Sequence, residues 1–118
     1  MRAAYSGAFT EFLRGAYPEA WESFATVDEG GHARRVIEAV SEGVVFASAE
    51  HTLHADYAAA LRPLRSALSV ARSIEQAFAY WGRPYDYDFD FFSDQAIVCS
   101  ELVYKSWEPG PGIEGIAF

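Results

Sequence analysis

The chain has 118 residues, of which 51% are hydrophobic and 16% aromatic, so it can bury one core as a single domain over residues 1–118. Its formal net charge of −8 and its lack of Lys/Arg clusters argue against nucleic acid as a partner, because phosphate contacts need clustered cations. No stretch reaches the roughly 20 apolar residues of a membrane span and no signal peptide is visible, so the compartment is unknown, with the cytoplasm as the default.

The first half of the chain predicts one helix and several short strands. Apolar residues follow helical spacing between Ser6 and Tyr17, and Pro18 closes this helix. The strands expected after it cover residues 23–27, 35–40, 44–46 and 55–62. The first two of these strands form a hairpin around a turn at residues 28–31. The alanine run in the fourth makes its assignment ambiguous.

The second half predicts two helices with an extended segment between them. Apolar residues recur every three or four positions from residue 64 to residue 81, and Gly82 ends this helix. Its expected core face consists of Leu64, Leu68, Ala71, Ile74, Phe78 and Trp81. Residues 85–91 alternate aromatic and acidic side chains, as a half-buried strand does. A last helix begins close to Cys99 and ends before Pro109, so the pattern indicates an α+β domain.

Cys99 is the single cysteine of the chain and the candidate nucleophile. The N-terminus of a helix favours a thiolate, which is the reactive form of cysteine. The structural alternative is a buried, inert cysteine, because free cysteines are among the most buried residues. His51 and His54 lack a third ligand at a recognisable spacing, so we expect no metal and no cofactor.

Two segments carry a resemblance to a known family. Residues 82–86 (GRPYD), followed by residues 99–103 (CSELV), resemble the circularly permuted, YiiX-like branch of the NlpC-type papain-like cysteine hydrolases. Residues 36–44 and 56–63 resemble the strands that precede the long helix in that branch, in the same order. The resemblance spans roughly residues 20 to 107. It implies a papain-like α+β fold in which a small antiparallel sheet packs against helices.

The resemblance also implies roles for individual residues. Cys99 would be the nucleophile, and Glu38 would orient the catalytic histidine. Tyr85 could line a cleft beside the thiol and help to hold an oxyanion. The structural alternatives are a surface position for Glu38 and a core position for Tyr85.

The catalytic histidine has two candidate registers in this chain. Family members carry a Trp-Ser-His type sequence at the first hairpin strand, and the matching stretch here, which begins at Trp21, places Ser23 where the histidine is expected. In that register the base is lost, because serine cannot act as one. In the other register a shortened hairpin brings His32 opposite Cys99. Both registers stay open at this point.

The resemblance leaves two functions to weigh. The first is a papain-like thiol hydrolase or acyltransferase that uses Cys99 on an amide or ester of a peptide, cell-wall peptide or lipid-acyl substrate. The second is a degenerate member of the same fold that binds a ligand without turnover, which Ser23 favours. The chain lacks the family's initial Gly-Asp strand, and the family usually continues past the position of Phe118, so we expect the chain to be shortened at both ends. The sheet edge that this exposes implies either a homodimer or a marginally stable domain.

Overall fold

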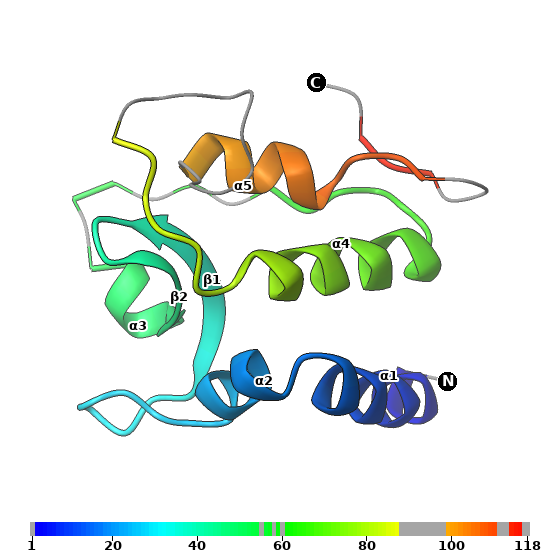
Figure 1. Ribbon diagram of the computed structural model, residues 1–118, viewed down its shortest axis with the longest axis horizontal. Helices are drawn as coiled ribbons and strands as arrows, with labels where there is room; N and C mark the ends of the chain where they lie inside the picture. Colours follow the sequence, from blue (N-terminus) through cyan, green and yellow to red (C-terminus); the bar gives the residue numbers. More distant parts are fainter. Residues whose placement is uncertain are drawn as a thin grey trace.

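The computed structural model describes residues 2–54, 56, 57, 59, 61–87, 99–110 and 114–116, with residues 2–6 described for the backbone alone. The elements in chain order are helices α1 (Arg2–Ala16) and α2 (Pro18–Phe24), strands β1 (Arg34–Val40) and β2 (Gly43–Ser48), and helices α3 (Ala49–Thr52), α4 (Ala67–Tyr80) and α5 (Cys99–Ser106). In Figure 1, α4 lies between α5 on one side and the α1–α2 pair on the other. The β1–β2 hairpin and α3 lie at one end of these helices. This mixture of helices with a small antiparallel sheet is the expected α+β fold.

The N-terminal region contains two helices where we expected one helix and a strand. The first helix is confirmed, but Pro18 occupies the first turn of α2 instead of ending the helical region. The predicted strand over residues 23–27 is therefore wrong. Trp21 and Phe24 lie three residues apart on a helix, and their rings meet at 5.2 Å between centroids. Phe24 also packs edge-on against Phe78, at 5.4 Å, so burial of the aromatic face stabilises a helix here.

The hairpin expected around residues 28–31 is formed by different strands. The turn itself is present, since Gly31 N donates to Asp28 O at 3.0 Å and Gly31 has a φ of 82°. Across it, however, only Val27 and Ala33 form an isolated antiparallel bridge. The strand after the turn pairs instead with the next strand along the chain, so the hairpin of this protein is β1–β2.

The β1–β2 hairpin has one face in the core and one face outside it. Ile37 pairs with Phe46, and Ala39 pairs with Val44, on the core face. Both strands were expected from the sequence, and both extend slightly beyond the expected residues. Gly43 starts β2 with a φ of 110°, in the left-handed region that only glycine adopts without strain.

The fourth expected strand, over residues 55–62, is not formed by the described residues of that stretch, Asp56, Tyr57, Ala59, Leu61 and Arg62. No backbone hydrogen bond joins any of these five to another described residue, so they form no strand ladder with the described part of the chain. Of the extended segment expected over residues 85–91, only residues 85–87 are described, and the rest of this prediction lies outside the described residues. The rings of Tyr85 and Tyr87 meet at 5.1 Å in a T-shaped arrangement.

The long helix expected over residues 64–81 is confirmed as α4, although it begins later, after the cap residue Ser66. Ser66 accepts a hydrogen bond from Ser69 N at 3.2 Å, which satisfies a free N–H of the first turn. Its core face was predicted only in part, because Leu64, Leu68 and Ile74 are exposed. The residues that α4 buries are mostly small and allow close approach of neighbouring helices: Ser69, Ala71, Ser73, Ala77 and Phe78.

The core consists of two clusters that share Ile37. The larger one joins α1, α2, β2 and α4 through Leu13, Ala20, Phe46 and Phe78. The smaller one packs α5 on the hairpin through Leu102, Ala39 and Val44. Among the described residues, no helix has the length and apolar character needed to cross a membrane.

Candidate active site

Cys99 is the first residue of α5, as the sequence indicated, and its side chain is exposed. It is therefore not a buried structural cysteine. The helix behind it is firmly held, because Leu102 is only 4% exposed and packs on Ala39 and Val44 of the hairpin. At the other end of α5, Gln76 Nε2 donates to Ser106 O at 2.8 Å and ties the helix to α4. The fold thus presents one thiol at the start of a fixed helix.

Tyr85 lies on the same side of the hairpin as α5. It packs, partly buried, against the cluster that contains Ala39, Val44 and Leu102. The structure therefore brings Tyr85 and the helix that carries Cys99 to one cluster. The aromatic ring also fills core space there, so the two roles weighed for Tyr85 are compatible.

Glu38 lies on the opposite face of β1. Since Ile37 and Ala39 face the core, the alternation of a strand turns Glu38 outward, and the buried face is not the valine face. Glu38 Oε2 accepts a hydrogen bond from Thr52 Oγ1 of α3 at 3.4 Å. Glu38 is thus a half-buried carboxylate beside α3 and not beside α5.

His32 lies in the turn before β1, where Asp28 organises the backbone. Asp28 Oδ1 accepts hydrogen bonds from Gly30 N and His32 N, each at 2.9 Å, and lies 3.5 Å from His32 Nδ1. Asp28 Oδ2 accepts a hydrogen bond from Ser48 Oγ. The Ser48 hydrogen bond, followed by that of the His32 amide, lowers the pKa of Asp28 from 3.8 to about 2. His32 thus belongs to an anchored turn.

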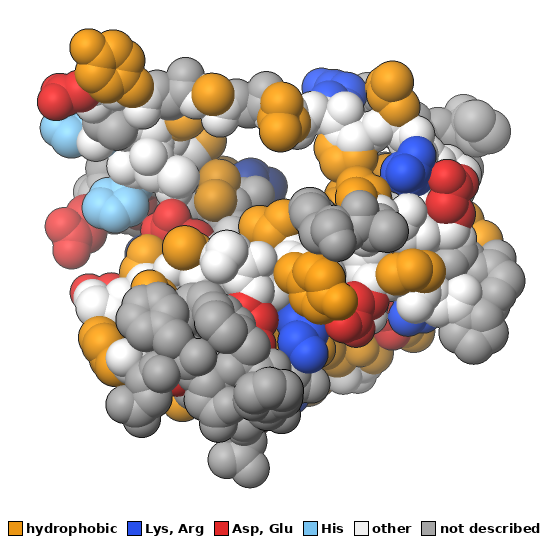
Figure 2. Space-filling model, turned by 90° about the horizontal axis from the view of Figure 1, so that it is seen from above, with side chains coloured by type: hydrophobic (Ala, Val, Ile, Leu, Met, Phe, Trp, Pro, Cys, Tyr) orange, Lys and Arg blue, Asp and Glu red, His pale blue; other side chains and the backbone are white. Residues whose placement is uncertain are grey.

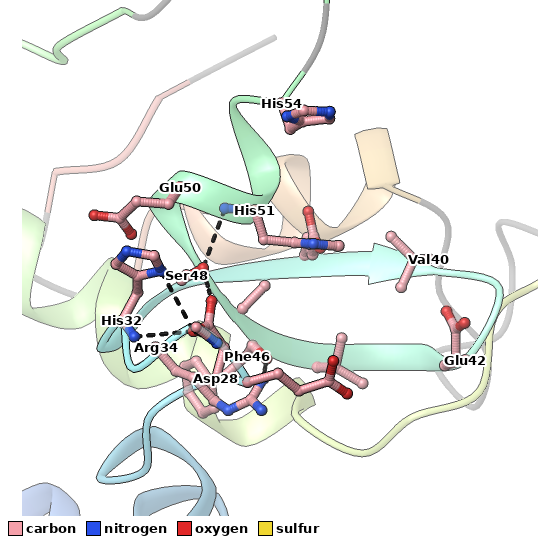
Figure 3. A pocket seen from close by; sticks show the side chains of 15 residues that line it. Asp28, His32, Arg34, Val40, Glu42, Phe46, Ser48, Glu50, His51 and His54 are labelled. Carbon is pink, nitrogen blue, oxygen red and sulfur yellow. Dashed lines mark hydrogen bonds and ion pairs between the residues drawn. The ribbon is translucent and has the colours of Figure 1, made fainter.

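A pocket of about 860 Å³ lies over the outer face of the hairpin, between the turn and α3. Figure 3 shows its side chains on the near side of the two strands, with α5 behind them. All three histidines of the chain line it, and so does Glu38: the histidines are His32, His51 and His54. In the part of the chain that the structure describes, no three His, Cys, Asp or Glu side chains are placed to hold a metal ion.

Sequence reasoning did not find this pocket. Its histidines come from two segments separated by the whole hairpin, and only the pairing of β1 with β2 brings them together. The one signal available was the alternation of β1, which places Glu38 and Val40 on a common face. That face is the floor of the pocket.

Ser23, at the position where the family histidine was expected, lies near the end of α2. Its carbonyl accepts hydrogen bonds from Thr26 Oγ1 at 2.6 Å and from Thr26 N at 3.1 Å. It is on a helix and not on a strand next to β1. In the described structure, no hydrogen bond joins Cys99 to Ser23, His32 or Glu38.

Comparison with known proteins places the chain in a family. The model of a family described as permuted papain-like amidase enzymes, YaeF/YiiX, C92 family, matches residues 18–114. No curated protein and no solved structure matches the chain. The match covers α2, the hairpin, the pocket, α4 and α5, which is most of the chain, and so this chain belongs to the permuted papain-like amidase family.

Proposed function

We propose that this chain carries out acyl transfer through Cys99. The thiolate sulfur bonds to the carbonyl carbon of an amide or ester, the C–N or C–O bond breaks, and the leaving amine or alcohol takes up a proton. Water or another acceptor then cleaves the thioester and returns the thiol. The observation that carries the proposal is the exposed thiol of Cys99 on the first residue of α5, in a chain that belongs to an amidase family.

The substrate of this reaction is an acyl compound whose carbonyl reaches the start of α5. We propose a peptide, a cell-wall peptide or a lipid-acyl group, and the description of the family as amidases supports an amide at the coarse level. Tyr85, which packs on the same cluster as α5, is the side chain that we propose to steady the developing oxyanion together with the Cys99 amide.

No hydrogen bond joins Cys99 to a candidate general base among the described residues. In the described arrangement His32 and Glu38 line the pocket on the outer face of the hairpin, so they could serve Cys99 only if β1 shifted by one residue against β2 and turned Glu38 to the face on which α5 packs. General-base assistance is worth roughly 10²- to 10⁴-fold in rate. We therefore propose that Cys99 turns over slowly in the arrangement described, and that His32 and Glu38 serve it only after such a rearrangement.

The test is acylation by a p-nitrophenyl ester, followed by release of p-nitrophenolate and by intact-protein mass spectrometry. We expect one acyl adduct on the native chain, none on Cys99→Ala, and continued turnover after the first equivalent. Ser100→Ala, which changes the exposed neighbour of the cysteine, is the matched control and should behave as the native chain. If Cys99→Ala retains the adduct, or the native chain forms none, the assignment of the nucleophile is wrong.

A second candidate function is binding without turnover, and the position of Ser23 favours it. Ser23 lies in helix α2 and not in a strand paired with β1. The three histidines line the pocket on the outer face of the hairpin, whereas α5 packs on its core face. An adduct that forms once and is never released would support this candidate. Ser23→His separates the two functions further: gain of turnover would show that the loss of the histidine is what silences the site.

We also propose that the chain forms a homodimer through the outer edge of β1. Edge strands present unpaired N–H and C=O groups that pair readily with another strand. Among the described residues the sheet consists of β1 and β2, and the edge of β1 away from β2 is the support for the proposal.

A further inference from the structure

Strand β1 carries one residue more than its partner strand. Arg34 lies opposite Ser48 and Val36 lies opposite Ala47, so Arg35 between them has no residue opposite it on β2. Such an extra residue is a β-bulge, which bends a strand and displaces its pairing by one position. The rest of β1 is therefore one residue out of step with the pair that opens the hairpin.

Both ends of the hairpin are held by other parts of the chain. At the end of β2, Ser48 Oγ donates a hydrogen bond to Asp28 Oδ2 in the turn before β1. At the start of β2, Val44 N donates to Arg83 O at 2.7 Å, and Val44 O accepts from Gly82 N at 2.8 Å. A shift of β1 against β2 must therefore take place between these fixed ends.

The turn between the strands has room for the extra residue. Val40 pairs with Gly43, so the turn consists of Ser41 and Glu42. If the extra residue of the bulge moved into the turn, Ala39 would pair with Gly43 and the turn would gain Val40. Hairpin turns of two and of three residues are both common. The shift thus exchanges a bulge for a longer turn and leaves the fixed ends in place.

The sequence of β1 specifies its register through a single side chain. From Val36 to Val40, Glu38 is the one polar residue, and a register is strongly specified only where the two faces of a strand differ. As described, Ile37 and Ala39 face the core while Glu38 lines the outer pocket. The polar surroundings of this pocket are visible at the left of Figure 2, where histidine and acidic side chains lie together. The cost of burying one carboxylate therefore favours the described register.

Arg35 holds the bulge in its described position. Its guanidinium lies over the ring of Phe24, at 4.5 Å from the ring centroid, and Arg35 Nη1 donates to Phe24 O at 3.2 Å. A cation over an aromatic face is attracted to it. In the shifted register Arg35 would lie opposite Ala47 and turn to the outer face, so both contacts with Phe24 would break.

We propose that the β1–β2 hairpin is a two-register switch, in which the extra residue moves between the bulge at Arg35 and the turn. The described register is the major state, and the shifted register is a minor state that carries Glu38 from the outer pocket to the core face. The inference rests on the proposed function, because it names the rearrangement that brings Glu38 to the helix of the nucleophile.

The shifted register places a carboxylate beside α5. Glu38 would lie opposite Val44, in the place that Ala39 occupies against Leu102. Leu102 follows Cys99 by three residues, and residues three apart lie on one face of a helix. The two registers thus differ in whether Glu38 lies on the side of the hairpin that carries the thiol.

The experiment is disulfide cross-linking across the hairpin in a Cys99→Ser chain. Val45→Cys with Glu38→Cys reports the described register, and Val45→Cys with Ile37→Cys reports the shifted one, because each register places only its own pair directly opposite. We expect both pairs to form a disulfide with oxidised glutathione, the second at roughly a tenth to a thousandth of the rate of the first, as for a minor state. Ile37→Cys with Ala47→Cys, which neither register places directly opposite, is the control and should form none in the same time.

Two single-residue deletions separate the registers further, in the same Cys99→Ser background. Deletion of Arg35 removes the bulge and keeps the two-residue turn, so it locks the described register. Deletion of Ser41 leaves too short a turn for that register, so it locks the shifted one. The Ile37→Cys and Val45→Cys pair should form its disulfide rapidly after deletion of Ser41 and not at all after deletion of Arg35. Equal rates in the two chains would overturn the inference.

Two substitutions test the switch in a hairpin of natural length. With the Ile37→Cys and Val45→Cys pair, Glu38→Ala removes the buried carboxylate and should raise the cross-linking rate roughly tenfold or more. Arg35→Ala releases the bulge and should raise it by roughly two- to fivefold. Glu29→Ala, at another carboxylate of the pocket, is the control and should leave the rate unchanged.

Absence of the shifted-register disulfide from the natural-length hairpin, or rates that neither substitution changes, would refute the switch. All of these chains lack the thiol of Cys99, so the result does not depend on the acyl transfer. A switch without an acyl adduct on the native chain would contradict the proposed function alone, and an adduct without a switch would contradict this inference alone.

Discussion

Ser48 Oγ donates a hydrogen bond to Asp28 Oδ2 and so ties the turn before β1 to the start of α3. Ser48 is fully buried, and its oxygen also accepts a hydrogen bond from His51 N at 3.1 Å as the N-cap of α3. One hydroxyl thus holds the two segments that supply the histidines of the pocket. The ionised form of Asp28 is the form that accepts this hydrogen bond together with two backbone N–H groups.

This network predicts a pH dependence of stability. Because the pKa of Asp28 falls from 3.8 to about 2 on folding, its contribution is present above about pH 4 and is lost as the pH falls towards 2. Asp28→Asn should lower the free energy of unfolding at pH 6, and the difference from the native chain should shrink between pH 4 and pH 2. Urea denaturation at several pH values measures it, with Glu29→Gln as control. A difference that stays constant with pH would rule out the network as its source.

The aromatic core predicts a large effect for Phe78. Its ring contacts Phe46 at 5.0 Å and Phe24 at 5.4 Å, and the residue is 5% exposed. Phe78→Ala should reduce the free energy of unfolding by about 3–5 kcal/mol, since it leaves a cavity between α2, α4 and β2. Phe12→Ala makes the same change at a residue 47% exposed and should cost far less. Equal losses in urea denaturation would mean that this cluster is not the core.

Gly43 predicts a backbone effect. A Cβ at this position would lie 2.6 Å from Arg83 O, at a φ of 110°. Gly43→Ala should therefore destabilise the protein by about 1–3 kcal/mol and loosen the contact between β2 and residues 82–83. Gly15→Ala, in α1 where a Cβ meets nothing within 4 Å, should be neutral or stabilise by up to about 1 kcal/mol. Thermal unfolding compares the two, and a harmless Gly43→Ala would show that the close approach is absent.

Tyr17 predicts a change at high pH. Burial raises the pKa of its phenol above 10.0, and the charge of Glu75 and its hydrogen bond with the Tyr17 hydroxyl, at 3.2 Å, raise it further. A raised pKa favours the protonated phenol in the folded state, so its contribution to stability is present below pH 10 and is lost as the pH rises through the folded pKa. Glu75→Gln should lower this pKa, which ultraviolet titration of the native and variant chains detects. Identical titrations would exclude the pair.

Much of the fold could be predicted from periodicity, and its errors have physical causes. The helix expected over residues 64–81 and the last helix, expected to begin close to Cys99, follow from apolar spacing and are present as α4 and α5. The strand expected over residues 23–27 was wrong. The prediction gave more weight to the β-branched Thr26 and Val27 than to the three-residue spacing of Trp21 and Phe24, which indicates a helix. Local preference decided the prediction, whereas burial against Phe78 decides the structure.

The candidate site was predictable only where it depends on neighbours in sequence. The start of a helix at Cys99 follows from the residues after it. The side of the hairpin on which Glu38 and His32 lie depends on which face of β1 the helices cover, and that is a property of tertiary packing. Neither the alternation of the strand nor the position of the turn contains that information.

The contact of Val44 with residues 82–83 has a consequence for how this protein can aggregate. A fibre of stacked strands grows only if every sheet offers two free edges, one to receive a strand and one to pass the ladder on. Here the β2 edge is already occupied at Val44 by the chain's own backbone. Strands added at β1 can therefore extend the sheet in one direction only. This hairpin is for that reason a poor template for the continuous strand addition that builds a fibre.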